Sequence, residues 1–134
     1  MARYLAIIDE ADGVYGVTFP DAPGCTAMGE TEEEAIDNAT EALGEWVADE
    51  LADGRDVPRA RSYVELLKAG EFGLGKGGVI AHVPLLIETG RLARANISLD
   101  SGLLADIDEA ASRRGVTRSA FLASAARDKI KAGA

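Results

Sequence analysis

The sequence predicts an α+β fold in two modules, and three observations carry this prediction. The chain opens with short strand-like segments separated by turn residues, and a pattern typical of a long amphipathic helix follows them. Charge and periodicity then change near residue 90. With 134 residues, 47% hydrophobic and 28% charged, the chain falls in the globular range and has room for two small domains. We expect these domains at residues 1–88 and 89–134.

The two modules differ in charge. Residues 1–90 carry 6 Lys and Arg against 18 Asp and Glu, whereas residues 91–134 carry 8 against 5. An acidic front module repels nucleic acid, while a basic rear module attracts it. The sequence shows nothing that resembles a signal peptide or a membrane span, so we expect the protein in the cytoplasm.

The start of the first module predicts three short strands. Residues 3–8 form an apolar run with two isoleucines, Asp12-Gly13 is a hairpin-type turn signal, and residues 14–19 predict the second strand. Two prolines and a glycine within residues 20–24 predict a tight loop. Residues 25–28 then supply a third strand.

A long helix follows these strands. Thr31 and Glu34 form a capping box, and three acids in the first turn suit the positive end of the helix dipole. Apolar residues then recur at helical spacing: Ile36, Ala39, Leu43, Val47 and Leu51. Gly54 marks the expected end. We expect a helix of about six turns that covers one face of a small sheet.

The remainder of the first module is less regular. Residues 62–68 begin with a second capping box and predict a short helix, and the glycines of residues 70–78 predict a flexible linker. Residues 79–85 predict a further strand, which Pro84 places near an edge or an end. The predicted order is β-β-β-α-β, with the short helix before the last strand.

Two patterns in this module resemble functional motifs but favour simpler interpretations. Residues 70–76 imitate the start of a phosphate-binding loop, yet Gly77 stands where Ser or Thr is needed, and a strand follows instead of a helix. Asp9, Asp12 and Asp21 are candidates for a metal-binding carboxylate cluster. All three lie in turn-rich sequence, where Asp bonds to its own backbone, so the structural interpretation leads.

The chain has one histidine and one cysteine, and neither predicts catalysis. His82 alternates with apolar neighbours on a predicted strand, which favours a structural or surface role. Cys25 has no neighbouring His or Lys in the sequence to lower its pKa, which favours inert burial. We therefore expect no enzyme activity, no catalytic residues, no metal site and no cofactor.

The rear module predicts one strand and two helices. Residues 91–99 alternate with period two, so that Ala95, Ile97 and Leu99 face one way while Arg94, Asn96 and Ser98 face the other. A helix capped by Asp100 or Ser101 ends before Gly115, and a second helix begins after Thr117. About 40 residues of this kind cannot bury a core alone, so we expect two copies to pair their strands and interleave their helices.

Such a two-stranded ribbon fits the major groove of DNA. Its outer face presents Arg94, Asn96 and Ser98, which have the chemistry to read guanine and adenine edges. The start of the second helix, Thr117-Arg118-Ser119, offers backbone N–H groups, hydroxyls and a positive charge to a phosphate. The simpler interpretation is that the polar residues are the solvated face of an edge strand.

Both modules resemble known families. Residues 91–131 resemble a ribbon-helix-helix DNA-binding domain of the MetJ/Arc type. The front module resembles the N-terminal domain of HicB-type antitoxins through Phe-Pro-Asp-Ala-Pro-Gly-Cys at residues 19–25, Gly-Glu-Thr at residues 29–31 and Glu34-Ala35. Some HicB antitoxins carry these two domains in this order.

The resemblance implies an antitoxin of a bacterial toxin–antitoxin system. Its front domain would be a partial RNase H-like fold without nuclease residues, which binds a small basic HicA-type toxin that cleaves mRNA. Its rear domain would bind operator DNA as a homodimer, with a tetramer left open, and repress its own operon. The protein would then associate with the nucleoid when it is bound to the operator.

Two alternatives remain open at this point. A dimeric repressor whose front domain senses a small ligand, without a toxin partner, has the same two-module organisation. A residual metal nuclease would use Asp9 and its neighbours.

Overall fold

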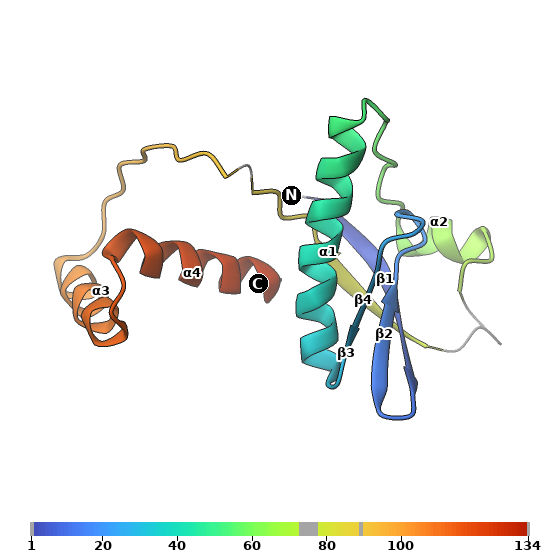
Figure 1. Ribbon diagram of the computed structural model, residues 1–134, viewed down its shortest axis with the longest axis horizontal. Helices are drawn as coiled ribbons and strands as arrows, with labels where there is room; N and C mark the ends of the chain where they lie inside the picture. Colours follow the sequence, from blue (N-terminus) through green and yellow to red (C-terminus); the bar gives the residue numbers. More distant parts are fainter. Residues whose placement is uncertain (1, 73–77, 89, 134) are drawn as a thin grey trace. The chain divides into compact units, whose positions relative to one another are not determined.

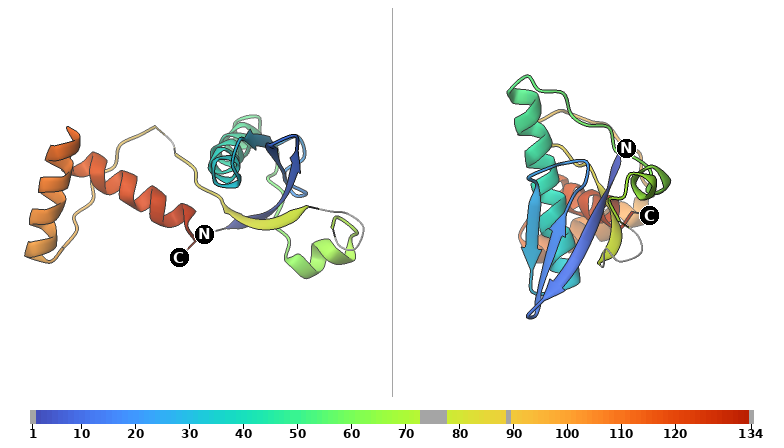
Figure 2. Two further views of the ribbon diagram at one scale, coloured as in Figure 1. Left: turned by 90° about the horizontal axis from the view of Figure 1, so that it is seen from below. Right: turned by 90° about the vertical axis from the view of Figure 1, so that its right-hand side faces the viewer.

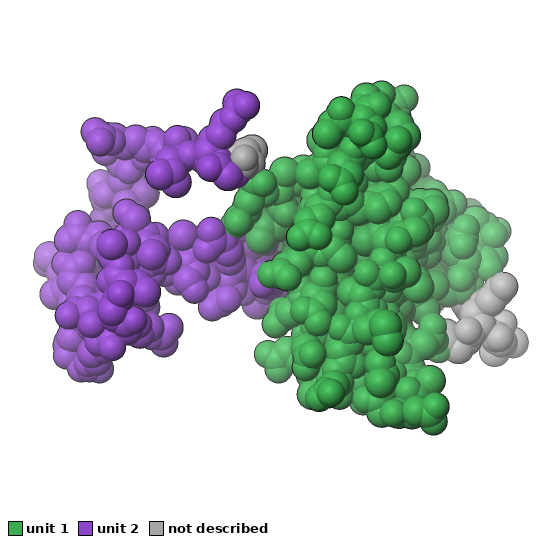
Figure 3. All heavy atoms as spheres, in the orientation of Figure 1, with its two compact units in different colours: residues 1–89 green, residues 90–134 purple. Residues whose placement is uncertain are grey.

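The computed structural model describes residues 2–72, 78–88 and 90–133 (Figure 1). Most of the glycine-rich stretch that we predicted to be a linker, residues 73–77, lies outside the described residues. The chain divides into two compact units, residues 1–89 and residues 90–134, which are coloured separately in Figure 3. Each unit has its own elements and is described by itself.

A four-stranded antiparallel sheet forms the centre of the first unit. Its strands are β1 (Arg3–Ala11), β2 (Val14–Thr18), β3 (Thr26–Gly29) and β4 (Val79–Pro84), in the order β3-β2-β1-β4. Asp12 and Gly13 both have positive φ, 54° and 80°, which is the geometry of the predicted hairpin turn. The register places Ile8 between Val17 on β2 and Val79 on β4.

The larger core lies between this sheet and helix α1 (Glu32–Ala52), which covers one face (Figure 2). Alternate side chains of β1 and β2 face this core, including Tyr4, Ile8 and Val17. From α1, a row at four-residue spacing packs against them: Ala35, Ala39, Leu43 and Val47. Each fully buried Leu or Val in this core contributes about 1.5–3 kcal/mol.

A smaller core covers part of the opposite face. Helix α2 (Tyr63–Lys68) contributes Leu66, which is buried together with Leu5 of β1 and Phe72. Ile7 and Ile80 pack against this cluster from the sheet. The central strand β1 is therefore apolar on both faces, which explains its near-continuous apolar run.

The helix starts of the first unit follow the predicted capping boxes. The Thr31 hydroxyl accepts a hydrogen bond from the backbone N–H of Glu34 at 3.1 Å, and the Ser62 hydroxyl accepts one from Glu65 at 3.2 Å. Gly54, the predicted stop of α1, has a φ of 72° and lies two residues after the helix ends. The strand and helix order predicted for this unit is confirmed.

The second unit contains two helices of 14 residues, α3 (Ser101–Arg114) and α4 (Arg118–Lys131). Asp100 caps α3 and Thr117 caps α4, and Gly115 between them has the left-handed φ of 67° that favours glycine. Among the described residues of this unit, only Ile107 and Ala111 are buried. Both belong to α3.

The predicted strand at residues 91–99 is absent from the single chain. All of these residues are exposed, and none belongs to a sheet within the described part. The physical reason is that a strand needs a neighbour to accept and donate its backbone hydrogen bonds, and the predicted neighbour belongs to a second copy. The ribbon itself therefore stays a prediction.

Candidate interaction surfaces

The outward surface of α1 carries a row of carboxylates. Five exposed acids follow one another at four-residue spacing: Glu33, Asp37, Glu41, Glu45 and Asp49. Residues at this spacing are neighbours on a helix surface and rise by about 6 Å per step. The row is offset by two residues from the buried row that begins at Ala35, which places it on the side of the helix away from the sheet. We call these five residues the acidic row.

The negative charges of the acidic row are not balanced by basic residues on the same helix. The sequence of α1 contains no Lys or Arg, although Glu–Lys pairs at this spacing are the usual way to stabilise a helix surface. Within residues 2–72, 78–88 and 90–133, the ion pairs at α1 involve Glu50, where Arg55 donates two hydrogen bonds of 2.9 Å. These bonds hold the pKa of Glu50 below its usual value. Like charges at four-residue spacing destabilise a helix, so the row does not serve the stability of α1.

Sequence reasoning did not single out the acidic row. It identified the net negative charge of the module and the acids of the first helical turn, but not the four-residue repeat that continues beyond them. The repeat is visible in the sequence as an acid at every fourth position from 33 to 49.

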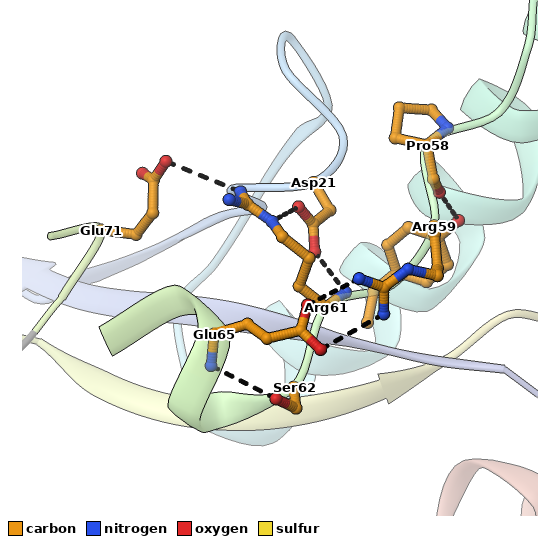
Figure 4. Close-up of polar contacts among 8 residues, drawn as sticks. Asp21, Pro58, Arg59, Arg61, Ser62, Glu65 and Glu71 are labelled. Atoms are coloured by element: carbon orange, nitrogen blue, oxygen red, sulfur yellow. Dashed lines mark hydrogen bonds and ion pairs between the residues drawn. The ribbon is translucent and has the colours of Figure 1, made fainter. Parts of the chain in front are cut away.

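A second polar cluster holds the segment between α1 and α2 in place (Figure 4). Asp21, from the Phe-Pro-Asp string, is 5% exposed and accepts hydrogen bonds from the backbone N–H of Arg61 at 2.8 Å and from its Nε at 2.6 Å. The Tyr4 hydroxyl donates to the carbonyl oxygen of Pro58 at 2.6 Å, and burial raises the pKa of Tyr4. Asp21 therefore has a structural role, as expected, but these bonds join it to Arg61 and not to the backbone of its own turn, which its sequence context suggested.

An open pocket of about 420 Å³ lies beside this cluster. Its lining includes Arg3, Arg59, Glu65 and His82. Arg59 donates to the Glu65 carboxylate at 2.6 Å, and this bond holds the pKa of Glu65 below its usual value. The positive charge of Arg59 is thus compensated within the wall of the pocket. His82 is exposed on β4, in agreement with the prediction of a surface or structural histidine.

The described residues show no arrangement for metal or thiol chemistry. Within them, no group of three or more His, Cys, Asp or Glu residues has the geometry to hold a metal ion. Asp9 and Asp12 lie at the β1–β2 hairpin, whereas Asp21 is bound to Arg61. Cys25 is buried, and this burial raises the pKa of its thiol to about 11, as expected for an inert cysteine.

The structure places the six predicted DNA-binding residues in two groups. Arg94, Asn96 and Ser98 are exposed along the extended segment before α3. The second group, Thr117, Arg118 and Ser119, lies at the start of α4. The Thr117 hydroxyl caps the helix and accepts a hydrogen bond from the backbone N–H of Ala120 at 3.1 Å. Arg118 and Ser119 are the first two residues of the helix. The single chain does not bring the two groups into one site.

Arg118 has a partner that the sequence did not predict. Its Nε and one terminal nitrogen donate to the two carboxylate oxygens of Asp108 on α3, at 2.7 and 2.8 Å. These hydrogen bonds hold the pKa of Asp108 below its usual value. The ion pair links the two helices.

The second unit exposes apolar side chains that an independent domain would bury. Ile97 is 63% exposed, Leu103 49%, Val116 42% and Leu99 39%. Because only Ile107 and Ala111 of its described residues are buried, the single chain supplies only a small core between the two helices. The pattern fits a surface that a second polypeptide covers. Within the described residues, no helix is both long enough and apolar enough to cross a membrane.

Comparisons with known proteins agree across both units. Residues 4–126 match the model of a family described as the HicB-like antitoxin of bacterial toxin–antitoxin systems. The crystal structure of the antitoxin HicB of Burkholderia pseudomallei is similar, with 37% identity, a TM-score of 0.55, and coverage of 94% of this chain and 96% of that one. The antitoxin HicB3 is similar with 26% identity and a TM-score of 0.55, over 96% of this chain and 98% of that one.

A chain in a HicA3–HicB3 toxin–antitoxin complex shares the fold at 21% identity. This match has a TM-score of 0.53 and covers 62% of this chain and 96% of that chain. It concerns the fold alone.

Proposed function

The chain belongs to the HicB-like antitoxin family of bacterial toxin–antitoxin systems, and from this premise we propose that it neutralises a small basic toxin and represses its own operon. The toxin we propose is of the HicA type, which cleaves mRNA. The first unit, a partial RNase H-like domain, binds the toxin, and the second unit, a ribbon-helix-helix domain, binds operator DNA. Both activities belong in the cytoplasm, where mRNA and the operator are found.

The acidic row is the observation that carries the toxin-binding proposal. A protein that binds RNA presents Lys and Arg to the phosphate backbone, so its RNA-binding surface is positively charged. Five exposed carboxylates with no basic neighbour on α1 form a complementary surface. Such complementarity steers encounter and raises the association rate. The antitoxin would then cover the surface that the toxin uses for RNA.

Neutralising part of the acidic row tests this proposal. We expect Glu41→Gln with Glu45→Gln to slow association with the purified toxin about threefold to tenfold at low salt, with a smaller effect at high salt. Stopped-flow fluorescence measures the rate. The matched control is Asp106→Asn with Asp128→Asn, which removes two charges from exposed positions of the second unit. Equal rates for the two double variants would contradict the acidic row as the surface that the toxin binds.

The DNA-binding proposal rests on the second unit. Its exposed apolar residues, such as Ile97 and Leu103, require a partner, and a second copy of the chain supplies an identical surface. In the paired form, residues 91–99 become a two-stranded ribbon that presents Arg94, Asn96 and Ser98 to the major groove. Thr117, Arg118 and Ser119 then meet the DNA backbone at the start of α4. Pairing of dimers into a tetramer is compatible with this arrangement.

The pocket beside α2 favours one alternative, in which the first unit senses a small ligand. Its volume of about 420 Å³ is within the range of small-molecule sites. Its cations are partly compensated, since Arg59 is bonded to Glu65 in its wall. The substitution His82→Ala alters the pocket on the sheet side. Under the antitoxin proposal it leaves both toxin neutralisation and operator binding unchanged, whereas a ligand sensor would lose its regulated repression.

A further inference from the structure

The bond between Arg118 and Asp108 occupies one of the two hydrogen-bonding edges of the guanidinium. Nε and one terminal nitrogen form a planar fork that donates two parallel hydrogen bonds to a carboxylate or to a phosphate. In the single chain, both donors of this fork are directed at the two oxygens of Asp108, at 2.7 and 2.8 Å. A DNA phosphate that approached Arg118 would meet a fork already engaged by a carboxylate.

Asp108 also places a negative charge close to the start of α4. It lies on α3, ten residues before Arg118, and its carboxylate reaches the first residue of α4. Arg118 is the one predicted phosphate-binding residue with a full charge, because Thr117 and Ser119 contribute hydroxyls. The carboxylate therefore places a negative charge beside the predicted phosphate position, where it repels DNA as well as competing for the fork.

Two other arginines at the end of α3, Arg113 and Arg114, have different partners. Arg113 pairs with Glu109 one turn earlier in the same helix, so this pair stays within α3. Arg114 lies over the ring of Phe121, with 5.7 Å between its guanidinium carbon and the ring centroid. Among these contacts, only the bond from Asp108 engages a residue that we place against DNA.

We propose that Asp108 is an intramolecular competitor for DNA phosphate at Arg118, so that the carboxylate weakens DNA binding and the pair opens when DNA binds. This inference rests on the proposed DNA-binding function of the second unit. Both side chains are about half exposed, 53% for Arg118 and 45% for Asp108, so solvent and a DNA phosphate can reach the pair. Asp108 thereby limits affinity through a contact that is independent of DNA sequence.

The test compares two neighbouring acids on α3. Asp108→Asn removes the competing charge, whereas Glu109→Gln removes the same charge from the adjacent position and releases Arg113 instead. Both variants are made in the full chain, and circular dichroism verifies the fold. The probes are a labelled duplex from the region upstream of the gene and a scrambled duplex of equal length and composition. Fluorescence anisotropy over a range of salt concentrations gives the dissociation constants.

We expect Asp108→Asn to tighten binding to both duplexes about twofold to fivefold, and more than Glu109→Gln does. The preference for the upstream duplex should not change, since phosphate contacts carry no sequence information. In an Arg118→Gln background, Asp108→Asn should have no larger effect than Glu109→Gln. This last result separates competition at Arg118 from a general change of net charge.

Equal effects of the two substitutions, or weaker binding by Asp108→Asn, would overturn the proposal. Weaker binding would mean that Asp108 orients Arg118 for DNA. A wild-type protein that binds the upstream duplex no better than the scrambled one would contradict operator recognition. In that case the dissociation constants of the two variants on the scrambled duplex still show whether Asp108 competes with DNA phosphate for Arg118. Wild-type protein that binds neither duplex at low salt overturns both proposals.

Discussion

The two units bury their apolar residues to very different extents. The first unit packs α1 on one face of its sheet and α2 on the other, with Leu43, Val47 and Leu66 almost fully buried. The second unit buries only Ile107 and Ala111 among its described residues and leaves Leu103 half exposed. This difference teaches that the first unit has an apolar core of its own, whereas the second buries little within one chain, which supports our proposal that a second copy covers it.

The largest expected effect concerns the core of the first unit. Leu43→Ala should lower the free energy of unfolding by about 3 kcal/mol, because Leu43 is fully buried between α1 and the sheet. The matched control, Leu51→Ala on the same helix, removes a side chain that is 57% exposed and should cost well under about 1 kcal/mol. Urea denaturation followed by tryptophan fluorescence measures both. Similar losses would contradict the assigned core.

Dimerisation of the second unit gives the next effect. Leu103→Asp places a charge on a surface that we propose to be covered by the second copy, so the dimer should dissociate at least about tenfold more readily. Analytical ultracentrifugation of the full chain measures the change. Because the cores of the first unit consist of its own residues, we expect its circular dichroism and unfolding to stay the same. A dimer that survives Leu103→Asp would mean that the chains pair through another surface.

The ribbon prediction separates the two units by function. Arg94→Ala or Asn96→Ala should weaken operator binding by about 1–3 kcal/mol for each lost base contact and leave toxin neutralisation intact. The measurements are anisotropy on operator DNA and growth of cells that express the toxin. If both substitutions leave operator affinity unchanged, the ribbon does not read the DNA.

The smallest effect concerns pH. The pKa of Cys25 is raised to about 11 by burial, so the folded state binds the thiol proton more tightly than the unfolded state does. The stabilisation is present below the unfolded pKa, near 9, and is lost as the pH rises toward about 11. We therefore expect stability to fall over this range, and to fall less in Cys25→Ala. Chemical denaturation between these pH values measures it, and identical profiles would exclude a contribution from Cys25.

Local signals in the sequence predicted most of the first unit. The capping residues Thr31 and Ser62 located two helix starts, and Asp12-Gly13 located the hairpin, because each acts through neighbours within three residues. The bond from Arg61 to Asp21 joins residues 40 positions apart, so no local sequence pattern predicts it. Helix α2 begins two residues after Arg61 and contacts the sheet through Leu66, which is buried with Leu5, and this long-range packing has no local sequence signal either.

The candidate surfaces were less predictable than the fold. The bonding of Arg118 to Asp108 requires the angle between α3 and α4, which the spacing of residues does not specify. The predicted strand at residues 91–99 does not form in the single chain, which is what we expect if its hydrogen-bond partner belongs to a second copy. The acidic row, in contrast, is visible in the sequence as a four-residue repeat. The structure adds that α1 buries its opposite side, so that the row forms one exposed surface.

The most direct test of toxin neutralisation is co-expression of the full chain with the small open reading frame next to its gene, followed by affinity purification and intact mass measurement. A parallel sample uses residues 1–89 alone. We predict that both forms retain a small basic protein that is toxic by itself, and that only the full chain binds DNA. Recovery of the full chain alone, as a DNA-binding dimer, would contradict toxin binding and favour a ligand-sensing repressor.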